Sequence, residues 1–195
     1  MPNMSATDST SPLISPAYRT EQERLHEAGS YGQVSILYAP MVSQIIDRME
    51  VDHLLDYGCG AQTNLAKHLK VARKLVYQAY DPAVPRFAKA PMPAQMVACI
   101  DVLEHIEPEY LETVLDDLQR LAEGIVFLTV TTCAAKKVLS DGRNAHLTQQ
   151  PMAWWLPKFM DRWEIQTVQT ISAESFFVVG TVPPRLEGTD GKPLL

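Results

Sequence analysis

The spacing of apolar residues changes near residue 50, from a helical repeat to short runs of strand length. Residues 18–28 are polar and compatible with a helix, and residues 36–49 carry apolar side chains at helical spacing. Pro40 lies inside the second segment, so we expect that helix to begin or kink there. The predicted parts of the chain are a disordered tail (1–15), an N-terminal helical segment (16–50), an α/β domain (51–182) and a second disordered tail (183–195).

Within the α/β domain, apolar runs alternate with helical segments. The predicted strands are 51–56, 75–80, 95–100, 125–130, 164–171 and 176–182. The predicted helices are 63–69, with Thr63 as N-cap, 110–122, and 151–163, which Pro157 should kink or end. This order predicts an α/β fold with a doubly wound, mostly parallel sheet, and the last two strands predict an antiparallel C-terminal hairpin.

Three predicted strands end at or directly before an acidic residue, namely Asp56, Asp81 and Asp101. Ligands of such sheets bind at the carboxyl ends of the strands. The first of these ends continues into Gly58-Cys59-Gly60, where glycine lets the backbone turn sharply and approach a ligand. A tight strand–helix connection would use the same glycines. Thr63 replaces the third glycine of a dinucleotide fingerprint, which disfavours NAD.

Composition and charge narrow the function classes. A chain of 195 residues predicts one domain with tails, and its net charge of −6 disfavours a protein that coats duplex DNA. Three cysteines are too few for a disulfide framework and are expected to be reduced thiols of a cytoplasmic protein. We expect no membrane association, since no run approaches the roughly 18 apolar residues of a membrane span, and no secretory signal is evident.

The strand-end motifs resemble those of class I S-adenosylmethionine (SAM)-dependent methyltransferases. Leu54–Gly60 looks like the first motif of that superfamily, Tyr80-Asp81-Pro82 like the second, and Asp101–Ile106 is similar to a segment of its small-molecule enzymes. The resemblance implies a Rossmann-like fold, with SAM as the cofactor. The cofactor residues that it implies are Asp56, Gly58, Cys59 and Gly60 under the methionine end, Asp81 and Pro82 at the ribose, Asp101, Val102 and Leu103 near the adenosine and sulfonium, and Tyr31 as part of a lid.

The chain departs from this pattern in two places. Gln62 stands where the motif has its third glycine. The segment 82–100 is too short for the helix, strand and helix that the family has there, and four prolines interrupt it. We therefore expect the sheet to lack one helix–strand unit, together with the usual adenine-contacting residue.

Carboxylate and imidazole side chains gather after the third predicted strand. Asp101, Glu104 and His105, with His146 from a later loop, are residue types that bind Mg, Mn, Fe or Zn. The pattern resembles the metal ligands of small-RNA 2′-O-methyltransferases. Two other interpretations stay open: His105 or His146 as a general base, and Glu104 and His105 as caps of the following helix. The remaining histidines, expected at the surface or in turns, are His26, His53 and His68.

The polar loop 141–146 and the segment after it carry the candidate substrate residues. Arg143 and Asn144 could meet an anionic or polar group, and Trp154 and Trp155 could stack on a ring or base. A solvated arginine and a tryptophan packed on the sheet are the alternatives. The DNA-methylating classes are disfavoured because their Pro-Pro-aromatic and Pro-Cys motifs are absent from the sequence.

These features together predict methyl transfer from SAM to an oxygen or nitrogen of a small-molecule or nucleotide-like substrate. Four residues would surround the reacting atom, namely Asp101, Glu104, His105 and His146. Catalysis would consist mostly of positioning. One alternative is a metal-assisted O-methyltransferase that acts on RNA ends or modified nucleotides. Another is a non-catalytic binding protein with the same fold.

Overall fold

A six-stranded sheet lies at the centre of the described part of the chain, which comprises residues 12–27, 29 and 33–183 of this computed structural model. The strand order is β2-β1-β3-β4-β6-β5. Strands β2, β1, β3 and β4 run parallel, and β6 is antiparallel to both β4 and β5. The strands are β1 (His53–Tyr57), β2 (Val76–Tyr80), β3 (Ala94–Cys99), β4 (Ala122–Thr131), β5 (Glu164–Ser172) and β6 (Ser175–Thr181).

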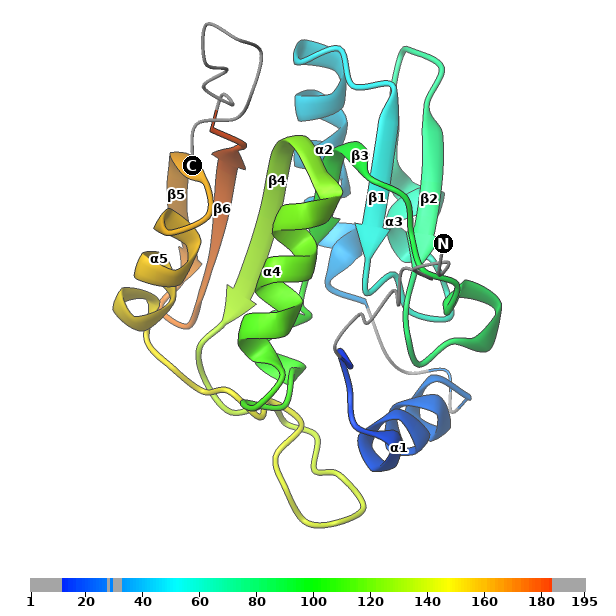
Figure 1. The fold of residues 1–195 in the computed structure, drawn as a ribbon, viewed down its shortest axis with the longest axis vertical. Coiled ribbons are helices and arrows are strands. Elements are labelled where there is room, and N and C mark those ends of the chain that lie inside the picture. Colours follow the sequence, from blue (N-terminus) through cyan, green and yellow to red (C-terminus); the bar gives the residue numbers. More distant parts are fainter. Residues whose placement is uncertain (1–11, 28, 30–32, 184–195) are drawn as a thin grey trace, which may run out of the picture.

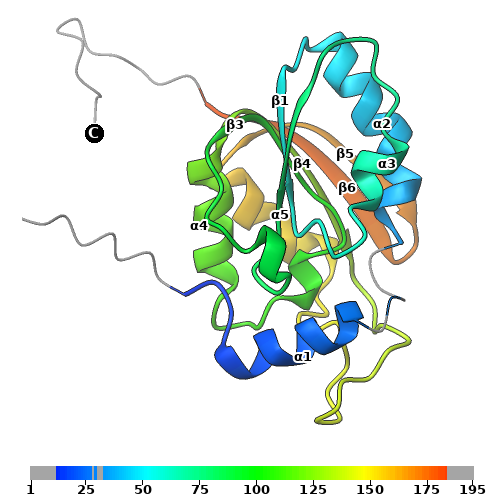
Figure 2. The same ribbon diagram turned by 90° about the vertical axis from the view of Figure 1, so that its right-hand side faces the viewer.

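Helices cover both faces of the sheet (Figure 1). The side view in Figure 2 has α4 and α5 on one face and α2 and α3 on the other, while α1 crosses the lower end of the sheet. The helices are α1 (Pro16–Glu27), α2 (Ser35–Arg48), α3 (Asn64–His68), α4 (Leu111–Leu121) and α5 (Met152–Met160). None of the described helices combines the length and apolarity needed to cross a bilayer.

Each face of the sheet buries its own apolar layer. On one face, α4 buries an apolar stripe that consists of Leu111, Val114, Leu115, Leu118 and Leu121. On the other face, Val42 and Ile46 of α2 belong to the same buried cluster as Leu54 of β1. The predicted fold class, a doubly wound and mostly parallel sheet with an antiparallel C-terminal hairpin, is thereby confirmed.

The connection from β2 to β3 is short, as the sequence predicted. Its described residues contain only one short helical element, the 3-10 turn η1 (Pro85–Phe87), and no strand. The Gln78 side chain exchanges two hydrogen bonds of 2.9 Å with the backbone of Met92, which holds the returning chain beside β2. In the strand order, β2 is an edge strand of the sheet.

The structure rules out a helix start at Pro40, a helix end at Pro157 and an N-cap at Thr63, while the predicted kinks at the two prolines stay predictions. α2 runs through Pro40 and α5 continues past Pro157, so neither proline begins or ends its helix. Both prolines are exposed, where water can solvate the carbonyl left without an N–H partner. Thr63 stands at the start of α3, but its backbone is left-handed (φ 46°) and its hydroxyl donates to the Gln62 carbonyl instead of capping the helix.

Described structure begins before the predicted end of the N-terminal tail. Ile14 is 9% exposed, and Ser15 donates from its backbone N–H and its hydroxyl to the carboxylate of Glu107, at 2.9 and 2.7 Å. These contacts fix the start of α1 against the loop that follows β3.

Candidate functional site

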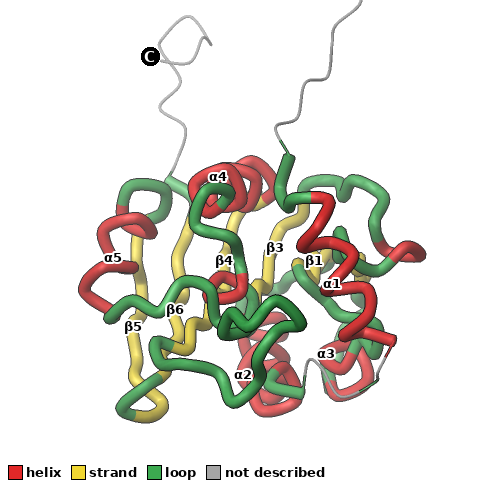
Figure 3. Tube along the Cα trace, turned by 90° about the horizontal axis from the view of Figure 1, so that it is seen from below, coloured by secondary structure: helices red, strands yellow, loops and turns green. Residues whose placement is uncertain are grey.

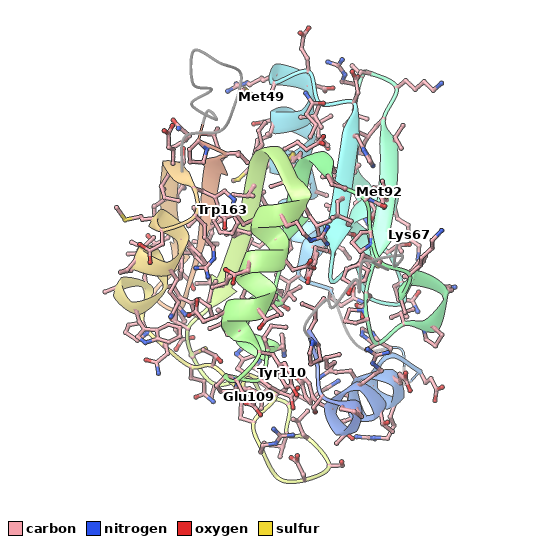
Figure 4. All side chains as sticks on the ribbon, viewed as in Figure 1. Met49, Lys67, Met92, Glu109, Tyr110 and Trp163 are labelled. Carbon is pink, nitrogen blue, oxygen red and sulfur yellow. The ribbon has the colours of Figure 1, made fainter. Side chains whose placement is uncertain are left out.

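A pocket lies at the carboxyl end of the parallel strands, between the sheet and α1; Figure 3 views this end. Figure 4 places Glu109 and Tyr110 toward the same end of the molecule, with Met49 at the opposite end. The lining of the pocket combines the ends of β1, β2 and β3 with side chains of α1. The predicted cofactor residues that line it are Asp56, Gly58, Cys59, Gly60, Asp81, Pro82, Asp101 and Val102.

Two predicted cofactor residues are not part of the described lining. Leu103 is fully buried in the apolar layer beneath α4. Tyr31 lies outside the described residues, so its predicted place in a lid stays a prediction.

The glycine turn is shaped by contacts that only glycine permits. Gly58 and Gly60 both have positive φ, at 77° and 62°. The backbone N–H groups of Gly58 and Cys59 donate to the Tyr80 carbonyl at 2.8 and 3.0 Å, which ties the turn to the end of β2. A Cβ on Gly58 would lie 2.4 Å from a methyl carbon of Val102, so the turn also packs against the end of β3.

Asp81 presents a fixed carboxylate to the pocket. One oxygen accepts the backbone N–H of Gly60 at 3.0 Å, and the other accepts that of Ala83 at 2.9 Å. The side chain is 9% exposed, and burial raises the pKa of Asp81 despite these bonds and the nearby His26. Each oxygen retains acceptor capacity, which suits recognition of hydroxyl groups.

Asp56 and Asp101 give the pocket further acidic groups in different environments. Asp56 is buried and accepts the Tyr77 hydroxyl, and burial raises the pKa of Asp56 to about 7. Asp101 has a left-handed backbone (φ 60°), and its N–H donates to the Thr129 hydroxyl at 2.9 Å. A non-glycine residue in this conformation is strained, and such strain is common at functional sites.

The structure brings Asp101, His105 and His146 together. One ligand atom from each lies within 4.8 Å of the others. The Nδ1 atom of His105 lies 2.8 Å from the Ala145 carbonyl oxygen, and that of His146 lies 2.6 Å from the Cys133 carbonyl oxygen. Burial lowers the pKa of His105 to about 4, so its ring is neutral at pH 7. Neutral imidazoles oriented by backbone carbonyls are typical of metal ligands.

Glu104 does not join that cluster. Its side chain is fully buried, and one carboxylate oxygen accepts the backbone N–H of Thr131 at 2.6 Å. Burial and the nearby Asp101 both raise the pKa of Glu104 well above its usual value. Glu104 therefore holds the backbone at the end of β4 and is not among the three grouped ligand-type side chains.

The predicted substrate residues do not line the described pocket. Arg143 is exposed and pairs with Asp141 at 2.7 Å, and the Asn144 side chain bonds to the backbone of its own loop. Trp154 is 36% exposed on α5. Trp155 is fully buried and its ring stacks near Phe159, with centroids 6.0 Å apart, so it packs on the sheet and presents no open face to a ligand.

The contribution of α1 to the pocket is absent from the sequence predictions. Its His26 lines the pocket with a side chain that is 9% exposed, so the expectation of a surface histidine is wrong. Tyr18 also lines the pocket, and its hydroxyl donates to the His105 carbonyl at 2.8 Å. The only sequence signal was the helical spacing of Ile14, Tyr18 and Leu25, which are buried among otherwise polar residues.

No protein-family model matches the chain, and no curated protein matches it in sequence. Solved structures match its fold. An O-methyltransferase family protein from Burkholderia thailandensis superposes with a TM-score of 0.58 at 15% identity, over 85% of this chain and 58% of that protein. The chain thus spans little more than half of that relative.

Two matches cover nearly all of the other protein. The first is 1,6-didemethyltoxoflavin-N1-methyltransferase from Burkholderia thailandensis, with bound 1,6-didemethyltoxoflavin and S-adenosylhomocysteine (SAH); its TM-score is 0.61 at 13% identity, over 92% of this chain and 97% of that one. The second is the N-methyltransferase NodS from Bradyrhizobium japonicum, in complex with SAH, with a TM-score of 0.55 at 11% identity over 84% and 99%. At these identities, what the chain shares with these proteins is the fold alone.

Proposed function

We propose that the chain binds SAM in the pocket at the carboxyl end of the sheet and transfers its methyl group to an oxygen or nitrogen of a small-molecule or nucleotide-like substrate. The main support for the proposal is that the Asp81 carboxylate and the Gly58–Gly60 turn line the same pocket and are joined by a hydrogen bond from the Gly60 N–H. The buried carboxylate suits ribose hydroxyls, and the turn leaves room for close approach of the methionine part. Similar folds with SAH bound support the same cofactor.

The acidic groups of the pocket complement the charge of this cofactor. Bound SAM would supply an electrophilic methyl carbon on a positively charged sulfur. Asp101 lies at the pocket wall beside Val102, where its carboxylate would stabilise a neighbouring positive charge. The contribution expected of the chain is mostly positioning, with the acceptor atom held in line with the methyl group and water kept away.

His105 and His146 are the proposed proton acceptors for the substrate hydroxyl or amine. A carbonyl oxygen can only accept a hydrogen bond, so the Nδ1 atom of each ring donates. In the neutral ring of His105, Nε2 then carries no hydrogen and can accept a proton. Glu104 would act through this arrangement, since its carboxylate fixes the backbone at Thr131, beside the site.

A metal-assisted reaction is the second candidate, and the convergence of Asp101, His105 and His146 favours it. Two imidazoles and one carboxylate suit a divalent transition metal such as Mn²⁺, Fe²⁺ or Zn²⁺. Such an ion at the end of the pocket would polarise an acceptor hydroxyl and favour its deprotonation. RNA ends or modified nucleotides with vicinal hydroxyls are the substrate class for which this variant is proposed.

Calorimetric titration with SAH tests the proposed function. The wild-type protein is expected to bind SAH, and Asp81→Asn should weaken binding about tenfold or more, because a hydrogen bond to a charged group contributes about 1.5–3 kcal/mol. Asp52→Asn is the matched control, since Asp52 is exposed and lies outside the pocket lining. A folded wild-type protein that binds no SAH would overturn the proposal and favour a non-catalytic binding protein.

A further inference from the structure

We propose that His26 is a second ribose-binding residue, whose imidazole hydrogen-bonds a ribose hydroxyl that Asp81 also holds. This inference rests on the proposed function, because it requires a ribose beside Asp81. It assigns a cofactor contact to α1, outside the three strand-end motifs.

The distance between the two side chains fits a bridging hydroxyl. His26 Nε2 lies 3.7 Å from Asp81 Oδ2, and both side chains are 9% exposed. That separation is longer than a direct hydrogen bond but shorter than twice a typical length of about 2.8 Å, so one oxygen atom can bond to both groups. A ribose hydroxyl can donate to the carboxylate while accepting from the imidazole.

His26 also lies over the glycine turn. Its Cε1 atom is 3.6 Å from the position that a Cβ on Gly60 would occupy. The same Gly60 donates its N–H to Asp81, so imidazole, carboxylate and turn surround one small region of the pocket. Burial lowers the pKa of His26, while the Asp81 charge opposes the shift. The ring is therefore neutral near pH 7 and carries one N–H.

The position of His26 is fixed by contacts along α1. Ser15, just before the helix, bonds to Glu107, and one turn later the Tyr18 hydroxyl donates to the His105 carbonyl. A further turn along, Glu21 accepts the backbone N–H and the hydroxyl of Ser140, at 3.0 and 2.8 Å. Figures 1 and 2 show the helix lying across the end of the sheet that these contacts define. His26 is thus placed by a helix held at three points.

The short β2–β3 connection explains why a contact from α1 is useful. β2 is the edge of the sheet, and its following segment forms only η1 within the described residues. Within the described residues, that segment adds no further strand beside β2. His26 supplies a side chain from α1 instead, and this side chain lies next to Asp81, the residue that would hold the ribose.

Calorimetric titrations with SAH and with its 2′-deoxy and 3′-deoxy analogues test this inference. His26→Phe keeps an aromatic ring but cannot hydrogen-bond, and it should bind SAH about five- to tenfold more weakly than the wild type. For the analogue that lacks the bridging hydroxyl, wild type and His26→Phe should differ by less than about twofold. His26→Gln should recover part of the affinity for SAH, and the control His68→Phe, at an exposed histidine, should match the wild type.

The outcomes separate this inference from the proposed function. Equal SAH affinity of wild type and His26→Phe overturns the ribose contact, and an equal loss for SAH and both deoxy analogues assigns His26 to packing instead. Wild-type protein that binds no SAH overturns both. If the wild-type protein binds SAH, and Asp81→Asn weakens that binding while His26→Phe does not, the result upholds the proposed function and overturns the ribose contact of His26.

Discussion

The imidazole rings of His105 and His146 meet edge to face, with centroids 4.7 Å apart and planes at 83°. They come from two different loops, one after β3 and one after β4, and each is oriented by a backbone carbonyl. Asp101 completes the cluster. An arrangement of two imidazoles and one carboxylate leaves coordination positions for substrate or water around a metal ion.

The first prediction concerns this cluster. Titration with Mn²⁺ or Zn²⁺ should reveal one tight site in the wild-type protein, and His146→Gln should weaken it at least tenfold, since it removes one of three ligands. His53→Gln is the control, because His53 lies at the start of β1, away from the cluster. Metal affinity that is unchanged in His146→Gln would remove the metal-assisted mechanism and leave the histidines as proton acceptors.

The second prediction concerns the glycine turn. Gly58→Ala should destabilise the protein by about 2–4 kcal/mol, because a left-handed backbone costs about 1 kcal/mol and the overlap with Val102 adds about 1–3. Gly142→Ala is the matched control, with φ 88° and nothing within 4 Å of the added methyl group, so it should lose about 1 kcal/mol. Urea unfolding measures both. Equal losses in the two variants would contradict the tight contact with Val102.

The third prediction follows from the raised pKa of Asp56, about 7 in the folded protein against about 3.9 in an unfolded chain. Between these values the folded state binds the extra proton. The contribution of Asp56 to stability is therefore fully present below pH 4 and is lost as the pH rises through 7, by at most about 4 kcal/mol.

Asp56→Asn removes this titration while its amide oxygen can still accept the Tyr77 hydroxyl. Between pH 5 and pH 8, the unfolding free energy of the wild type should therefore fall relative to that of Asp56→Asn. The control Gln62→Asn, at an exposed side chain with no ionisable group, should give a constant difference. A constant difference for Asp56→Asn as well would mean that the folded protein holds Asp56 ionised.

The fourth prediction separates support from ligation at Glu104. Glu104→Gln keeps the acceptor for the Thr131 N–H and should change stability by less than about 1 kcal/mol, whereas Glu104→Ala should cost about 2–4 kcal/mol through the lost acceptor and the cavity. Metal affinity should survive in Glu104→Gln. A large loss of metal affinity in this variant, with stability retained, would place Glu104 among the ligands.

Much of the fold follows from local patterns. The apolar stripe of α4 and the strand runs that end in Asp56, Asp81 and Asp101 are set by residues close together in the chain, and parallel pairing brings those strand ends to one edge. The missing unit after Asp81 could also be predicted, because four prolines and a short segment leave no room for it.

The parts that the sequence did not predict depend on distant contacts. The position of α1 is set by two hydrogen bonds, from Ser15 to Glu107 and from Tyr18 to the His105 carbonyl. Each bond joins residues that are far apart in the sequence, so no local pattern predicts it. The predicted site roles of Glu104 and Trp155 depended on their exposure. Both side chains are fully buried. The spacing of neighbouring residues does not show whether such a side chain is buried or lies in an open site.

A crystal structure of the protein with SAH tests the central claim most directly. The account predicts the ribose hydroxyls within about 3.2 Å of the Asp81 carboxylate, with the homocysteine part over the Gly58–Gly60 turn and the sulfur facing the side of Asp101. SAH bound elsewhere, or an empty pocket at saturating SAH, would contradict the account.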